Sequence, residues 1–141
     1  MKTIIYSSLA LVLAGGLISF NLPSENFKDA VPFQDINKGK AIYTKTCVAC
    51  HQANGAGIPK AFPPLAKSDY LNKDTNRAIK AVMNGLHGPI TVNGQKYNSA
   101  MPTQNLKDDQ IADVLTYVYS SWGNNKTKVT PAMVKALRGK K

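Results

Sequence analysis

The chain has few of the side chains on which most catalytic and metal sites depend. Its 141 residues include only two cysteines, two histidines, one tryptophan and eight acidic residues. A single site that uses both cysteines would use every thiol of the chain. A structural zinc site needs four cysteine or histidine ligands, so every such residue of this chain would have to meet at one place.

Long apolar stretches are also scarce, and the prominent one occupies residues 4–20, shortly after Lys2. Its length lies between a secretory apolar region of about 7–15 residues and a membrane-spanning helix of about 17–25 residues. We expect residues 1–20 to be a cleaved signal peptide, with a retained membrane anchor as the alternative. Residues 21–33 contain Pro23 and Pro32 without helical or strand periodicity, which predicts a linker before one domain at 34–138.

The shortage of acidic residues leaves 18 basic against 8 acidic side chains, a formal net charge of +10. Such a balance suits an acidic protein partner, a membrane surface or nucleic acid. The lysines are scattered rather than clustered, and nucleic acid is not expected for an exported chain. We therefore expect partner proteins with acidic surfaces, and a membrane only if the N-terminal segment is retained.

Both cysteines lie in one pentapeptide, Cys47-Val48-Ala49-Cys50-His51. The pattern C-x-x-C-H is typical of c-type haem attachment, in which two thiols add to the porphyrin vinyl groups and the adjacent histidine ligates the iron. A thioredoxin-like redox pair would follow a strand, whereas residues 36–46 have helical periodicity. A zinc site would have only His87 left as its fourth ligand.

Apolar periodicity predicts an all-α chain with irregular loops. The first helix begins after Asp35, a good N-cap, and places Ile36, Gly39, Tyr43 and Cys47 on one face. Further helices are expected at 75–84, ended by Gly85, at 107–122, with an apolar stripe that includes Trp122, and at 131–137. The Asn93-Gly94 pair predicts a small hairpin between 90–92 and 95–97.

These motifs, in this order, resemble the class I c-type cytochromes over residues 35–122. The resemblance implies a small cytochrome c fold, with three main helices and loops around one haem c bound covalently through Cys47 and Cys50. It also implies that the Pro63 carbonyl accepts a hydrogen bond from His51, within a proline-leucine segment that includes Leu65. The stretch from Tyr97 to Met101 resembles the distal methionine loop of that family.

Four residues are candidates for the sixth iron ligand: Met83, Met101, His87 and Met133. Met101 is favoured because it lies in a loop stiffened by Pro102, and His87 is the alternative. Met83 belongs to the apolar stripe of a predicted helix, and Met133 lies far out in the tail.

With both axial positions filled, the resemblance implies electron transfer between ferric and ferrous haem rather than catalysis. We expect a periplasmic or otherwise exported carrier, or an electron-transfer subunit beside a dedicated enzyme. The segment around the hairpin is similar to cytochrome modules of dehydrogenases and copper nitrite reductases. The alternatives are a haem enzyme or small-ligand sensor with a labile sixth ligand, and a haem-stabilised docking subunit.

Overall fold

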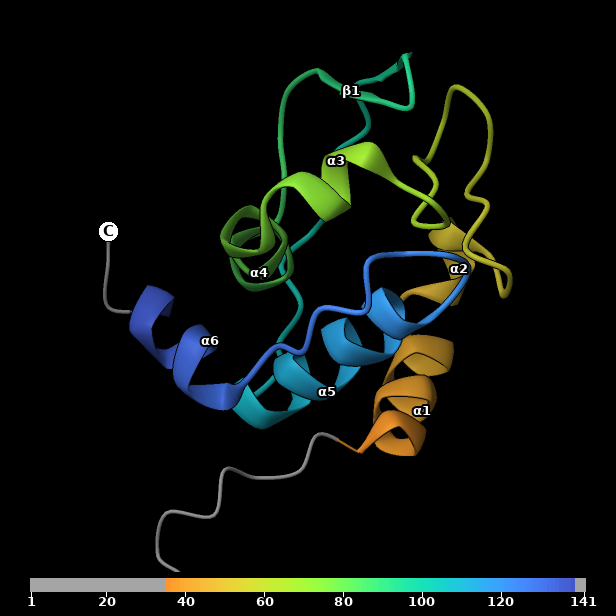
Figure 1. The fold of residues 1–141 in the computed structure, drawn as a ribbon. Coiled ribbons are helices and arrows are strands. Elements are labelled where there is room, and N and C mark those ends of the chain that lie inside the picture. The colour runs from red at the N-terminus through yellow and green to blue at the C-terminus, as the bar shows by residue number, and fades with distance from the viewer. Residues whose placement is uncertain (1–34, 139–141) are drawn as a thin grey trace, which may run out of the picture.

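The computed structural model describes residues 35–138, and within them the chain is mostly helical (Figure 1). The helices and the two strands follow in the order α1 (Ile36–Thr46), α2 (Val48–His51), α3 (Asp69–Lys73), α4 (Thr75–Asn84), β1 (Ile90–Val92), β2 (Gln95–Tyr97), α5 (Asp108–Ser120) and α6 (Pro131–Arg138). The predicted signal peptide or anchor at 1–20 and the linker at 21–33 lie outside these residues. Among the helices of the described part, none is long and apolar enough to cross a bilayer.

Helix α1 begins where the sequence predicts, because the Asp35 carboxylate satisfies two free amides of its first turn. The carboxylate oxygen accepts from the amide nitrogens of Asn37 at 2.9 Å and Lys38 at 3.3 Å. Cys47 ends the helix, its amide bonded to the Tyr43 carbonyl, and the short helix α2 follows directly. The helical segment before the two cysteines is thus confirmed.

The main packing contact joins α1 to α5, and Gly39 is the residue that allows it. A Cβ at this position would lie 2.8 Å from the Tyr117 Cβ and would collide with the Asp113 carbonyl. One turn later, the buried Tyr43 ring packs against Tyr117, with ring centroids 5.5 Å apart. Ile36 was expected on this buried face but is 47% exposed, because it precedes the crossing point by almost one turn.

Helix α5 buries the stripe predicted from its periodicity, Ile111, Val114, Leu115 and Val118. The predicted end at Trp122 is wrong, since the helix stops at Ser120 and Trp122 has a positive φ of 50°. The indole still reaches the core beyond the helix end, with its centroid 5.1 Å from the Tyr43 ring. Tertiary packing therefore buries part of this side chain without continuing the helix.

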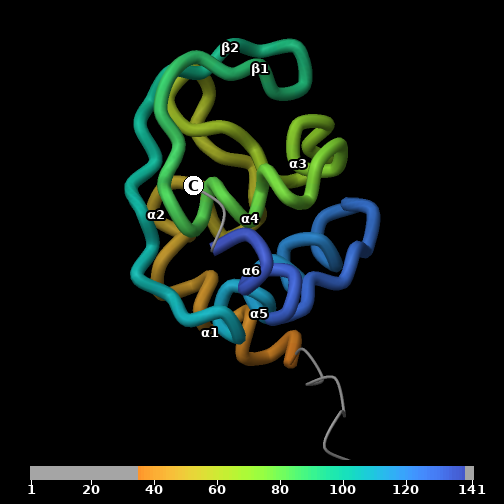
Figure 2. The backbone as a smooth tube through the Cα atoms, turned by 90° about the vertical axis from the view of Figure 1, so that its left-hand side faces the viewer, coloured from red at the N-terminus to blue at the C-terminus, as the bar shows by residue number. Residues whose placement is uncertain are grey.

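The predicted helix at α4 and the hairpin are both confirmed. The Asp74 side chain caps α4 through the Arg77 amide at 3.0 Å, and β1 pairs with β2 in antiparallel register across Asn93-Gly94. Helix α3 was not predicted, because five residues are too few to show a period; the Ser68 hydroxyl caps it through the Leu71 amide at 3.2 Å. Figure 2 shows the hairpin at the opposite end of the molecule from α1 and α5, with α3 and α4 between them.

Candidate haem site

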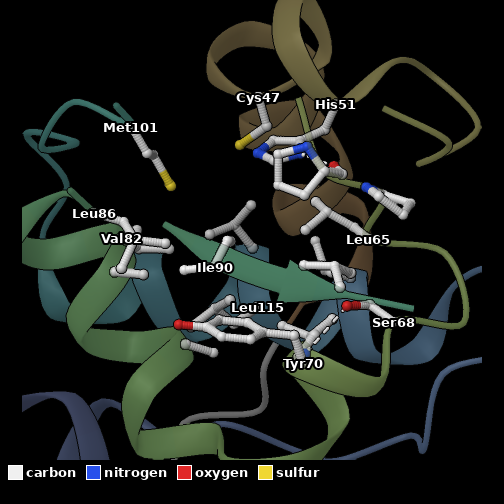
Figure 3. Close-up of a pocket in the computed structure, with 18 residues that line it drawn as sticks. Cys47, His51, Leu65, Ser68, Tyr70, Val82, Leu86, Ile90, Met101 and Leu115 are labelled. Atoms are coloured by element: carbon white, nitrogen blue, oxygen red, sulfur yellow. Dashed lines mark hydrogen bonds between the residues drawn. The ribbon is translucent and has the colours of Figure 1, made fainter. Parts of the chain in front are cut away.

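A cavity lies between α2, α4, α5, the hairpin and the segment that contains Pro63 (Figure 3). Its walls are almost entirely apolar, with side chains that include Leu65, Val82, Leu86, Ile90, Leu115 and Val118. A large, mostly apolar cofactor fits such a lining.

The two cysteines lie at the junction of α1 and α2, and each is half-buried. Both line a second hollow that shares His51 and Met101 with the main cavity. Burial raises the pKa of the Cys47 thiol, partly offset by a hydrogen bond with the Thr46 hydroxyl at 3.3 Å. Helix α1, rather than a strand, precedes the two cysteines, which argues against a thioredoxin-like redox pair.

His51 ends α2, and its imidazole ring points into the cavity (Figure 3). Its Nδ1 lies 3.0 Å from the Pro63 carbonyl oxygen. A carbonyl can only accept a hydrogen bond, so the proton is on Nδ1 and the lone pair on Nε2 is free. Burial lowers the pKa of His51, against the opposing effect of the Pro63 carbonyl, and the neutral form is the one that binds metals.

The loop after α2 holds the Pro63 carbonyl in place through its own backbone bonds. The Gly57 amide donates to the His51 carbonyl at 3.0 Å, and the Leu65 amide donates to the Gly55 carbonyl at 2.8 Å. These bonds lie on either side of Pro63 in the chain and fold the loop back onto the end of α2. The imidazole is thereby oriented by backbone rather than by a mobile side chain.

Met101 faces the cavity from the side opposite His51, with its sulfur directed inward (Figure 3). The other candidates for the sixth ligand line neither hollow. Met83 is buried in the hydrophobic core, Met133 packs against that core from α6, and His87 is exposed. Tyr97 is buried and lines the second hollow, and Leu65 lines the main cavity.

Several cavity residues were not identified from the sequence. Ser68 and Tyr70 reach the cavity from α3 and the residue before it, and Val92 reaches it from the hairpin. The sequence contained only a weak indication of these residues. Ser68 before Asp69 is typical of a helix start, but this pattern does not indicate which part of the molecule the helix packs against. Within residues 35–138, no group of three His, Cys, Asp or Glu side chains forms a metal site of the zinc kind.

The sequence model of the cytochrome c family matches residues 36–122 of this chain. The chain belongs to the cytochrome c family. It is 43% identical over 113 residues to cytochrome c-552 of Thermus thermophilus, a match that covers 73% of this cytochrome and 86% of that protein. The mostly helical fold with one small hairpin, predicted from the sequence, is the cytochrome c fold.

This cytochrome is also similar to parts of larger dehydrogenase subunits. It is 34% identical over 105 residues to the cytochrome c subunit of the quinone alcohol dehydrogenase of Gluconacetobacter polyoxogenes, covering 71% of this chain but 22% of that subunit. For the gluconate 2-dehydrogenase cytochrome c subunit of Pantoea cypripedii, the identity is 32% over 109 residues, with coverages of 74% and 24%. The cofactor is therefore covalent haem c, and the function is haem-mediated electron transfer.

Proposed function

We propose that Cys47 and Cys50 form the two thioether bonds and that His51 and Met101 are the axial ligands of the iron. The supporting observation is the pair of side chains that face each other across the apolar cavity. His51 has its free Nε2 because Nδ1 donates to Pro63, and Met101 is the only methionine in residues 35–138 that lines the cavity.

The two proposed ligands have different effects on the redox couple. When bound, the haem supplies a one-electron ferric/ferrous couple, and a thioether ligand such as Met101 favours the ferrous state and raises the potential. The hydrogen bond to the Pro63 carbonyl fixes the tautomer of His51 and raises its basicity as a ligand. Leu65 and Tyr97 keep water from the two sides of the site, since both belong to its lining.

The axial assignment is tested by replacing each candidate ligand separately. Met101→Ala should abolish the weak far-red band of ferric iron–methionine ligation and lower the reduction potential, because the sulfur no longer favours ferrous iron. His87→Ala is the matched control and should leave both unchanged, since His87 is exposed outside the cavity. If the His87 variant changes the spectrum and the Met101 variant does not, His87 is the sixth ligand.

Two filled axial positions also distinguish a carrier from a haem enzyme or a small-ligand sensor. Carbon monoxide added to the reduced wild-type protein should cause little spectral change, because Met101 occupies the position that the gas would take. Met101→Ala should respond readily. A full response of the wild type would favour the enzyme or sensor, with a labile sixth ligand.

We propose that the protein exchanges electrons with acidic partner proteins, as a carrier or as a subunit beside a dehydrogenase. The net charge of +10 and the similarity to dehydrogenase cytochrome subunits support this role. The lining of the second hollow contains no lysine, arginine or carboxylate. We therefore expect an uncharged contact area, with exposed lysines such as Lys60 and Lys96 guiding the approach.

We further propose that the protein is exported to the periplasm through residues 1–20. The supporting feature is the apolar run at 4–20 behind Lys2. The intact mass of protein purified from a host with haem-attachment machinery tests the proposal. A mass that lacks about the first twenty residues supports a cleaved signal, and a full-length mass in the membrane fraction supports an anchor.

A further inference from the structure

The backbone that carries Met101 is tied directly to the end of α4. The Leu86 amide donates to the Met101 carbonyl and the Met101 amide donates to the Leu86 carbonyl, each at 2.9 Å. We call this pair of hydrogen bonds the base clamp. Three residues later, the Gln104 amide donates to the Val82 carbonyl at 3.0 Å, so the segment stays attached to α4 after Met101.

Gly85, directly before the base clamp, permits this close approach. Its φ is +78°, and a Cβ there would lie 2.5 Å from the Met101 carbonyl oxygen and 3.1 Å from the Thr103 amide nitrogen. Both neighbours are backbone atoms, which cannot rotate away as the end of a side chain could. A side chain at position 85 therefore forces the Met101 backbone away from α4.

The hairpin at the far end of the same segment has a separate attachment. The Asp69 amide donates to the Asn93 side chain at 3.0 Å, and the Asn93 amide donates to the Asp69 carboxylate at 2.7 Å. The contacts at the hairpin turn involve neither Gly85 nor Met101. Loosening the base clamp should therefore displace Met101 while the hairpin stays over the cavity.

We infer that Gly85 is a positioning residue for Met101: it allows the base clamp, which aims the sulfur into the cavity before any bond to iron forms. The inference rests on the proposed role of Met101 as sixth ligand. A preorganised ligand loses less conformational freedom on binding, so exogenous ligands compete with it less well. A weakened clamp should show as a more easily displaced sulfur.

The test compares Gly85→Ala with Gly88→Ala in the ferric, haem-loaded protein. Gly88 is a matched control, because its φ is +87° but a Cβ there meets nothing within 4 Å. Gly85→Ala should weaken the far-red band and bind imidazole about tenfold more tightly than wild type or Gly88→Ala. Equal bands and equal imidazole affinities in the two variants would overturn the inference while leaving Met101 as ligand.

Amide hydrogen exchange provides a second test that does not depend on the Gly85 variant. In Met101→Ala the amides of Leu86 and position 101 should remain more protected than those of His87 and Ala100, which have no backbone acceptor within residues 35–138. Loss of that protection would mean that the iron–sulfur bond forms the clamp, contrary to the inference. A wild-type protein without the far-red band would instead refute the proposed ligand and the inference with it.

Discussion

Gly39 allows α1 and α5 to approach each other closely because it has no side chain. In an exposed helix, alanine in place of glycine would add about 1 kcal/mol of stability. At the crossing of α1 and α5, the added methyl group meets the Asp113 carbonyl and the Tyr117 Cβ. Helix propensity therefore predicts that alanine at position 39 stabilises the protein, whereas the tertiary contact predicts that it destabilises the protein.

We expect Gly39→Ala to lower the free energy of unfolding by about 1–3 kcal/mol, the usual cost of overpacking. Denaturant unfolding of the haem-loaded protein measures the change. Lys40→Ala, one residue along on the exposed side of α1, is the control and should change stability by less than about 0.5 kcal/mol. A Gly39→Ala protein as stable as wild type would mean that the helices separate easily.

Tyr43 should make the folded protein less stable at alkaline pH. Its side chain is 1% exposed and its hydroxyl donates to the Gln52 carbonyl at 2.7 Å. Burial is the main reason that the pKa of Tyr43 is raised far above its ordinary value. In the unfolded chain the same tyrosine ionises near pH 10, so above that pH the unfolded state binds fewer protons and stability falls.

Replacing Tyr43 by phenylalanine removes this proton and the hydrogen bond together. We expect Tyr43→Phe to cost about 1 kcal/mol at neutral pH, through loss of the bond to Gln52. Above about pH 10, the wild type should lose up to about 1.4 kcal/mol per pH unit more than the variant. Denaturant unfolding of both proteins at a series of pH values between 8 and about 11 measures both effects. If the stability of the two proteins falls equally with pH, Tyr43 ionises in the folded protein.

At the scale of elements, a buried apolar contact and an exposed ion pair both attach α6, and they should contribute unequally to stability. Val134 on α6 is completely buried in the core. Arg138 forms a 2.7 Å salt bridge with Asp108 on α5, but the two side chains are 48% and 29% exposed. Exposed ion pairs usually contribute less than about 1 kcal/mol.

We therefore expect Val134→Ala to destabilise the protein by about 2 kcal/mol, through lost apolar burial and the cavity left behind. Arg138→Ala should cost less than about 1 kcal/mol, and high salt should remove most of that cost. Thermal unfolding at low and high salt separates the two contributions. The reverse order of the two variants would show that the ion pair holds α6 in place.

The whole molecule carries 18 basic and 8 acidic residues, and this excess should affect its encounters. Electron exchange with a small anionic reagent such as ferricyanide should slow as salt rises, because the Debye length falls to about 8 Å near physiological ionic strength. Stopped-flow rates across a salt series measure the effect. A rate independent of salt would contradict electrostatic guidance but would not contradict the electron-transfer function.

Charge reversal shows which lysines contribute to this guidance. Lys60 lies in the loop after α2 and Lys96 on the hairpin, two segments that contribute residues to the lining of the site, whereas Lys135 lies on α6; all three are exposed. Lys60→Glu and Lys96→Glu should slow the low-salt reaction several-fold more than Lys135→Glu, which has the same change in net charge. Equal effects of all three would mean that only net charge matters.

Much of the molecule could be predicted because the relevant interactions are local. The attachment motif is five consecutive residues, Asp35 and Asp74 cap their own helices, and Asn93-Gly94 closes a two-residue turn. Capping and turn formation involve residues no more than about four positions apart, so these interactions can be recognised from the sequence alone. The sequence therefore determined the haem type, the starts of α1 and α4, and the hairpin.

Other features depend on segments that meet only in the folded chain. The exposure of Ile36 depends on where α1 crosses α5, and Trp122 packs against the Tyr43 ring although α5 ends before it. The sequence alone left four candidates for the sixth ligand, whereas the tertiary structure brings only Met101 to the cavity. Gly85 was identified only as a helix stop, because the Met101 carbonyl that requires a glycine is sixteen residues away in sequence and adjacent in space.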